Sequence, residues 1–226
     1  MPKIAKGVVK FQKKVFPGKK DLFQTLADGQ TPEVLFITCS DSRIDPSLLT
    51  QTEPGELFIC RNAGNIVPPH AQITGGTTAS IEYAVAVLGV QHIVVCGHSG
   101  CGAMTGALNP ESTKELPHVS QWLSNSQAAV QIMKEKSEGL TDKEKMDLLI
   151  HENVLLQLQH LKTHPYVAAR LAVNKIHLHG WVYDIKTGGI DAYSERDGKF
   201  YPVEEVYAEE VEALVSRRCN KEQTQT

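Results

Sequence analysis

Residues 34–39 read VLFITC and residues 92–98 read HIVVCGH. Both stretches are short, rich in β-branched residues and almost continuously apolar, a pattern typical of strands that a parallel sheet buries on both faces. We therefore expect strands at 34–38 and 92–96, with Cys39 and His98 just beyond their ends. Because ligands bind beyond the carboxyl ends of the strands in open α/β sheets, these two side chains should converge if the strands are neighbours.

The rest of the chain alternates strands with helices. Further strands are expected at 57–62 and 175–183, with a hairpin partner for the latter around 189–193. Helical periodicity covers 77–88, 119–136 and 143–162, and residues 141–144 (TDKE) form a capping-box pattern before the last of these. This order predicts an α/β fold with a central, mostly parallel β-sheet flanked by helices.

A chain of 226 residues is long enough for one domain with a substantial core, and we expect a single domain over 1–226. Its beginning, about residues 1–28, alternates lysines with apolar residues and is predicted to form an amphipathic helical arm that packs on a partner subunit. The polar tail, about 220–226, is expected to fray. We also expect an edge strand near Tyr183 to extend a sheet across an interface.

Composition excludes several classes of function. The formal net charge is −3, so the balance of charges requires neither a nucleic acid nor an anionic membrane as partner. The sequence shows no signal-peptide pattern and no stretch long enough to span a bilayer, which predicts a protein of the cytoplasm or of a compartment within it. The five cysteines are an odd number, which disfavours a disulfide framework.

Two short motifs carry the candidate chemistry. The first is CSDSR at residues 39–43, and the second is HSGCG at residues 98–102. Cys39, His98 and Cys101 together offer two soft thiolates and one imidazole, a good ligand set for a tetrahedral zinc ion. The rival interpretation is a Cys39 nucleophile with His98 as its base, but it leaves Cys101 without a role. Cys60 and Cys96 fall within strands and are expected to be core residues.

Asp41 has two alternative roles beside such a zinc ion. As a fourth ligand it would close the site, as in structural zinc centres, whereas paired with Arg43 it would leave the fourth position to water, as in catalytic ones. We favour the second arrangement for the active form, because a guanidinium binds a carboxylate through two parallel hydrogen bonds. Asp41 would then orient a zinc-bound hydroxide, which zinc makes available near neutral pH.

Other candidate residues receive simpler interpretations. His177 and His179 lie two residues apart on one face of their strand, a spacing that can suit a metal, but we expect them to pack in the core or at an interface beside Trp181. The pair Gly75 and Gly76 precedes a helix and could cradle an anion. Because no lysine of the phosphate-loop type follows, a nucleotide site is not expected.

The two motifs, in this order, resemble those of the β-class carbonic anhydrases, in the branch found in plants and bacteria. The similarity extends to EPGELF at 53–58, RNAGNIVP at 61–68, IEYAV at 81–85 and HGWVYD at 179–184. The resemblance implies a lyase that hydrates carbon dioxide reversibly to bicarbonate and a proton by means of a metal-bound hydroxide. It also implies a homo-oligomer built as a dimer or a multiple of dimers.

For the site, the resemblance implies one Zn²⁺ per chain held by Cys39, His98 and Cys101. Asp41 and Arg43 would be the catalytic pair, with Asp41 a metal ligand only in a closed state. A substrate pocket is implied at a dimer interface. The positions that match its residues are Gln30, Phe58, Ala63, Tyr83 and Gly102.

One position departs from the pattern of some bacterial members of the family. Those members bind an inhibitory bicarbonate beside the active site through an arginine, a tyrosine and a tryptophan three residues before the first cysteine. Here the first two positions hold Arg61 and Tyr183, but the third holds Phe36, which lacks an indole N–H donor. We therefore predict that this chain lacks that regulated closed state.

Two alternative functions remain open from the sequence. A related hydrolase could use the same zinc on carbon disulfide or carbonyl sulfide, and turnover of both kinds of substrate would distinguish the two enzymes. In a different class, the zinc could be a closed structural centre in a scaffold protein, with Asp41 as a permanent ligand. The intact Asp41 and Arg43 pair and the matching pocket positions disfavour this second alternative.

Overall fold

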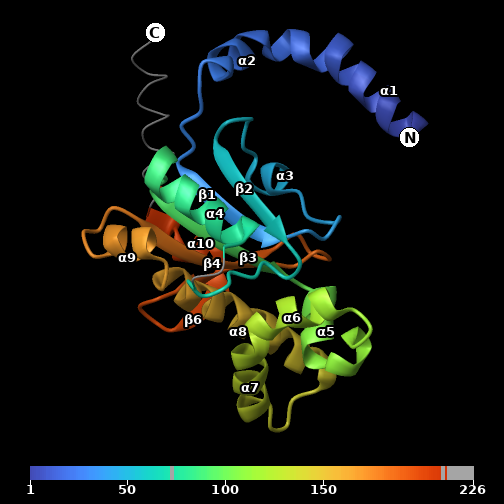
Figure 1. Ribbon diagram of the computed structural model, residues 1–226, viewed down its shortest axis with the longest axis vertical. Coiled ribbons are helices and arrows are strands. Elements are labelled where there is room, and N and C mark those ends of the chain that lie inside the picture. The colour runs from blue at the N-terminus through green and yellow to red at the C-terminus, as the bar shows by residue number, and fades with distance from the viewer. Residues whose placement is uncertain (72–73, 210–211, 213–226) are drawn as a thin grey trace.

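The computed structural model describes residues 1–71, 74–209 and 212. Among these, six strands form one sheet in the order β2-β1-β3-β4-β5-β6 (Figure 1). The strands are β1 (Val34–Cys39), β2 (Leu57–Asn62), β3 (His92–His98), β4 (His177–Tyr183), β5 (Ile190–Ser194) and β6 (Lys199–Pro202). The pairs among β1 to β4 are parallel, whereas β5 is antiparallel to both of its neighbours, β4 and β6, which confirms the expected mostly parallel sheet.

Helical segments flank this sheet and also form an arm at the N-terminus. The α-helices are α1 (Pro2–Lys10), α2 (Lys20–Ala27), α3 (Pro46–Thr50), α4 (Gly76–Glu82), α5 (Gly102–Leu108), α6 (Pro117–Leu123), α7 (Gln127–Lys136), α8 (Asp142–Lys162), α9 (Pro165–Leu171) and α10 (Val203–Val206). Short π or 3₁₀ turns are η1 (Phe11–Val15), η2 (Phe16–Lys19), η3 (Tyr83–Leu88), η4 (Pro110–Thr113) and η5 (Ser124–Ser126). No helix among the described residues is both long and apolar enough to cross a membrane.

The alternation of side chains along β1 divides the core into two layers. Leu35 and Ile37 point into the larger core, which also contains buried side chains of η3, α5, α7 and α8. Phe36 points to the other face, where it packs with Val94 and Cys96 in a smaller cluster. Burial on both faces explains why these strands read as continuous apolar runs, and it fixes their register.

The long helix α8 packs unusually close to the sheet beside the strand ends. Its N-terminus has the predicted capping box, formed by the side chains of Thr141 and Glu144. A Cβ atom added to Gly97 on β3 would lie 2.9 Å from Val154 Cγ2. A Cβ atom added to Gly180 on β4 would lie 3.0 Å from Val154 Cγ1. Glycine is therefore required at both positions for α8 to approach the sheet next to His98.

The N-terminal arm, from α1 to α2, runs away from the rest of the chain (Figure 1). None of its four helical segments has a buried residue. Phe11, Phe16 and Phe23 contact one another, with ring centroids 5.3–6.0 Å apart. The helical arm was expected, and its packing on a partner subunit stays a prediction.

Two expectations about secondary structure were wrong. Residues 119–136 were predicted as one helix, but they are divided between α6 and α7 at η5. There Ser126 donates its hydroxyl to Asn153 Oδ1 and Asn125 donates to the Trp122 carbonyl, so side chains replace helical backbone partners. The strand near Tyr183 was expected to lie at a sheet edge, but β4 pairs with β5, and the short β6, which was not predicted, forms the edge. Cys219 and the tail at 220–226 lie outside the described residues.

Candidate metal centre

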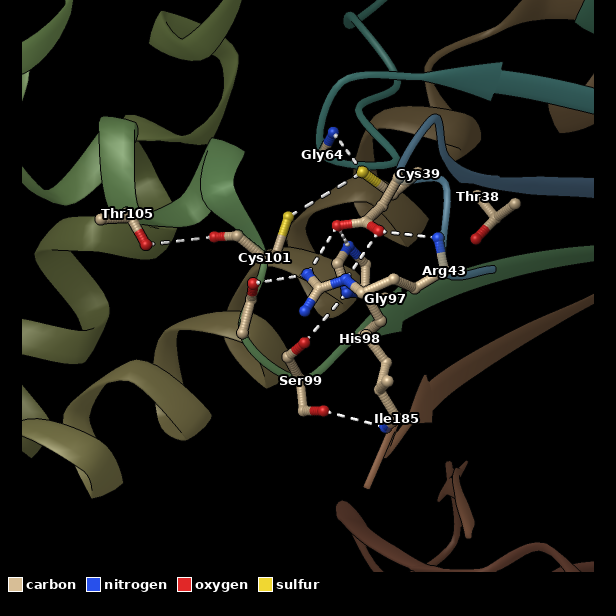
Figure 2. Close-up of polar contacts among 12 residues, drawn as sticks. Thr38, Cys39, Arg43, Gly64, Gly97, His98, Ser99, Cys101, Thr105 and Ile185 are labelled. Carbon is tan, nitrogen blue, oxygen red and sulfur yellow. Dashed lines mark hydrogen bonds and ion pairs between the residues drawn. The ribbon is translucent and has the colours of Figure 1, made fainter. Parts of the chain in front are cut away.

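Two neighbouring strands and one helix start bring the three predicted zinc ligands together. Cys39 ends β1, His98 ends β3, and the two strands pair in parallel. Cys101 precedes the first residue of α5 as its N-cap. One ligand atom from each residue lies within 4.8 Å of the others, and all three side chains are buried. The two sulfur atoms are 4.0 Å apart and face each other (Figure 2).

His98 is oriented as a metal ligand. Its Nδ1 lies 3.0 Å from the Ser99 carbonyl oxygen, which accepts a hydrogen bond from the Nδ1–H tautomer (Figure 2). Its Nε2 is buried without a hydrogen-bond partner. Since buried polar atoms are rarely left unpaired, an imidazole with one nitrogen anchored and the other facing two thiols fits a zinc ligand.

The two thiols need a cation to be ionised together. The hydrogen bond with Cys101 lowers the pKa of Cys39 against the opposing effect of burial, with help from His98 and the Gly64 amide. The hydrogen bond to Cys39, burial and the neighbouring negative charge raise the pKa of Cys101. The protein alone thus stabilises one thiolate and one thiol, and a divalent cation would compensate for the second negative charge. The donor set fits zinc.

Asp41 is held beside the donor set by Arg43. The Arg43 Nε and backbone N–H both donate to Oδ1 at 2.9 Å, and Nη2 donates to Oδ2 at 2.7 Å. These hydrogen bonds hold the pKa of Asp41 well below its usual range. Oδ2 lies 3.9 Å from His98 Nε2, so the carboxylate faces the donor set while bound to the guanidinium.

Backbone carbonyls fix both arginines of the site. Arg43 Nη2 also donates to the Gly100 carbonyl at 3.2 Å, and this hydrogen bond connects the first motif to the second. Arg61 donates to the Cys39 carbonyl at 3.0 Å and to the Asp41 carbonyl at 2.7 Å. This role of Arg61 was not predicted, since a backbone acceptor leaves no signal in a sequence.

The predicted pocket residues fall into two groups. Ala63 directly follows β2, whose end pairs with Cys39, and Gly102 is the first residue of α5. Phe58 instead pairs with Leu35, four residues before Cys39 and hence about 13 Å away along β1. Its ring packs against Tyr83 at 5.9 Å between centroids. Gln30 precedes β1, so one chain alone does not bring Gln30, Phe58 and Tyr83 to the donor set.

His177 and His179 lie at the opposite end of the sheet from the metal centre. His179 Nε2 is 3.0 Å from His92 Nδ1, and its Nδ1 is 2.8 Å from the Tyr207 hydroxyl, to which Trp181 also donates. Burial lowers the pKa of His179 to about 4, so it stays neutral. His179 therefore packs beside Trp181 as expected, whereas His177 is exposed and its ring stacks on that of His92.

A mostly parallel sheet with a Cys₂His donor set at its strand ends, and a carboxylate beside that set, is the arrangement of a zinc enzyme. Residues 34–190 match the family model described as carbonic anhydrase. A carbonic anhydrase of Pseudomonas aeruginosa is 48% identical over 205 residues, covering 91% of this chain and 93% of the relative. One from Synechococcus elongatus is 46% identical over 191 residues, covering 84% of this chain and 70% of the relative.

Solved structures agree with these relatives. The β-carbonic anhydrase CcaA matches with a TM-score of 0.87 at 41% identity, covering 89% of this chain and 91% of the other. A tetrameric β-carbonic anhydrase from Sordaria macrospora matches with a TM-score of 0.71 at 34% identity, covering 84% of this chain and 92% of the other. The chain therefore belongs to the β-class carbonic anhydrase family. The reaction is zinc-dependent hydration of carbon dioxide, as the resemblance implied.

Proposed function

We propose that this chain converts carbon dioxide reversibly to bicarbonate and a proton, with zinc held by Cys39, His98 and Cys101 and with Asp41 and Arg43 as the catalytic pair. The observation that carries the proposal is the position of Asp41. Its carboxylate is bound by Arg43 at 2.7 Å and 2.9 Å and faces the donor set from 3.9 Å. This arrangement supports an open site in preference to a closed structural centre.

The residues of the chain orient the nucleophile and the substrate. When bound, zinc supplies Lewis acidity and lowers the pKa of water to about 7. Asp41, kept ionised by Arg43, accepts the hydrogen bond of the attacking hydroxyl group and so directs a lone pair toward the carbon of carbon dioxide. The guanidinium also holds the carboxylate away from the donor set. The Gly102 amide, at the start of α5, would donate to an oxygen that becomes negative.

The pocket is completed by a second copy of the chain. Ala63 and Gly102 lie beside the metal ligands, whereas Gln30, Phe58 and Tyr83 lie at the far end of β1 and β2. A two-fold dimer can place the second group of one subunit over the metal centre of the other. The Phe58 and Tyr83 rings would then form an apolar slot for a linear, nonpolar gas, and Gln30 would donate to a bicarbonate oxygen.

Mixed dimers test this shared pocket. A Gln30→Ala chain holds zinc but lacks the donor, and a Cys101→Ser chain lacks zinc but offers Gln30 to its partner. Each variant alone should be poorly active. After joint refolding, half of the dimers are mixed and each has one complete site, so activity should reach about a quarter of the wild-type value. Activity equal to the mean of the two separate variants would contradict a pocket shared between subunits.

Phe36 is predicted to prevent a bicarbonate-inhibited closed state. It is 1% exposed and its ring packs against Trp181 at 6.0 Å, while Arg61 is engaged with two backbone carbonyls. In a crystal grown at acidic pH with bicarbonate, we expect Asp41 to stay hydrogen-bonded to Arg43, because Phe36 offers no indole N–H donor to a bound bicarbonate. Phe36→Trp is the matched variant that supplies this donor. A wild-type crystal structure in which Asp41 ligates zinc and bicarbonate lies beside Arg61 would refute the prediction.

A reducing compartment such as the cytoplasm suits this site. Cys39 and Cys101 are free thiols with sulfur atoms 4.0 Å apart. A small movement would bring them to the roughly 2.05 Å of a disulfide bond, which would remove two zinc ligands. The chemistry of the ligands therefore supports the cytoplasmic location expected from the sequence.

A further inference from the structure

The loop that follows β2 packs closely against the start of α5 and contains two consecutive residues with a positive φ. Gly64 has a φ of 82° and Asn65 a φ of 47°, so two consecutive residues lie in the left-handed region that non-glycine residues disfavour. A Cβ atom on Gly64 would lie 2.9 Å from Ala103 Cβ and 3.1 Å from Met104 Cε, at the start of α5. The loop therefore needs partners that hold it against α5.

Two buried side chains of α8 provide these partners. Asn153 Nδ2 donates to the Gly64 carbonyl at 3.2 Å, and Gln157 Oε1 accepts from the Val67 N–H at 2.9 Å. Gln157 Nε2 donates to Asn153 Oδ1 at 2.9 Å, and Ser126 donates to the same oxygen at 2.8 Å. Asn153 is 1% exposed and Gln157 is fully buried, so both amides are shielded from bulk water and rely on each other and on the loop for hydrogen bonds.

The loop in turn contacts a zinc ligand. The Gly64 N–H donates to Cys39 Sγ at 3.3 Å (Figure 2). The carbonyl of the same residue accepts from Asn153, so Gly64 contacts α8 through its carbonyl and the zinc ligand through its N–H, and a shift of Gly64 away from α8 would move this donor as well. Hydrogen bonds to a ligand atom orient the ligand and tune its interaction with the metal.

We propose that Asn153 and Gln157 are positioning residues of the metal centre, which hold the Gly64 N–H on Cys39 Sγ and thereby slow the loss of zinc. This proposal rests on the proposed zinc site. It explains why α8 carries two amides where it faces the loop, although apolar side chains would fill a core without needing hydrogen-bond partners. An exclusively structural role predicts lower stability with unchanged zinc retention, and this difference makes the two roles separable.

The test measures zinc transfer from the holoenzyme to a chelator at a temperature at which every variant is folded. Asn153→Ala and Gln157→Met remove the two loop contacts, and either variant suffices if the other fails to fold. We expect both to release zinc about 10–100-fold faster than the wild type. With cobalt in place of zinc, we also expect a shift of the sulfur-to-metal charge-transfer band, which a loss of stability alone would not cause.

Two controls lie on the same helix. Glu152 is also buried, but it accepts from Lys136 of α7 at 2.7 Å and not from the loop, so Glu152→Gln should release zinc at the wild-type rate. Leu161→Ala creates a cavity in the core and reports the effect of lower stability alone. Zinc release from the two amide variants at the rate of the wild type, or at the rate of Leu161→Ala, would overturn the proposal. A wild type that retains no zinc would instead overturn the proposed function.

Discussion

Substitution of a zinc ligand should abolish both metal binding and activity. Cys39→Ser, His98→Ala and Cys101→Ser each leave two of three converging donors in a buried site. We expect less than one-tenth of the wild-type zinc content, and hydration of carbon dioxide lowered on the order of 10³-fold or more, because without the metal the pKa of water returns to its much higher value in bulk solvent. Metal analysis of the purified variants, together with stopped-flow hydration, measures both effects.

A buried cysteine outside the site provides the matched control. Cys60 lies on β2 and is 8% exposed, and burial raises the pKa of its thiol. Cys60→Ser should therefore keep its zinc and its activity, although a hydroxyl group in the core lowers stability somewhat. If one of the three ligand variants retained zinc and turned over at the wild-type rate, the assignment of that residue as a ligand would be wrong.

Asp41→Asn should separate metal binding from catalysis. The carboxylate is not needed to hold the ion, so the variant should contain as much zinc as the wild type. Its amide group, however, carries no negative charge and presents N–H donors, so it can neither be held by Arg43 in the same way nor accept the same hydrogen bond from the nucleophile. We expect kcat to fall about 10²–10³-fold, measured by stopped-flow on protein of known zinc content.

Asp45→Asn is a suitable comparison for this variant. Asp45 caps α3 by accepting from the Leu48 N–H at 3.2 Å, and asparagine caps a helix equally well. Asp45→Asn should keep wild-type turnover. This result would show that loss of a nearby negative charge alone does not cause the fall in kcat of Asp41→Asn. Full turnover by Asp41→Asn would refute the catalytic role of Asp41, although the assignment of the three zinc ligands would still hold.

The sequence was most informative where one physical constraint determined the pattern. Residues 34–39 and 92–98 are buried on both faces, so their apolar runs predicted strands, and the topology of parallel sheets then placed Cys39 near His98. The pairing of Asp41 with Arg43 followed from local spacing. The donor set was therefore predictable from strand ends and ligand chemistry, without knowledge of the surrounding helices.

What could not be predicted depends on contacts between distant segments. The division between α6 and α7 is stabilised by Asn153, which belongs to α8, and the orientation of Arg61 depends on the carbonyls of Cys39 and Asp41. The hydrogen bonds from Asn153 and Gln157 to the loop after β2 likewise have no local signal. The pocket residues were identified only through resemblance, since Gln30 and Phe58 lie far from the donor set within one chain.

The most direct test is stopped-flow hydration of carbon dioxide by the zinc-analysed wild-type protein, from mildly acidic to alkaline pH. An open zinc site predicts one zinc per chain and rapid turnover that rises smoothly through about neutral pH, where the nucleophile becomes available. Removal of zinc should abolish the turnover, and its return should restore it. Absence of turnover at every pH, with one zinc per chain, would contradict the account and would direct the next assays to carbon disulfide and carbonyl sulfide.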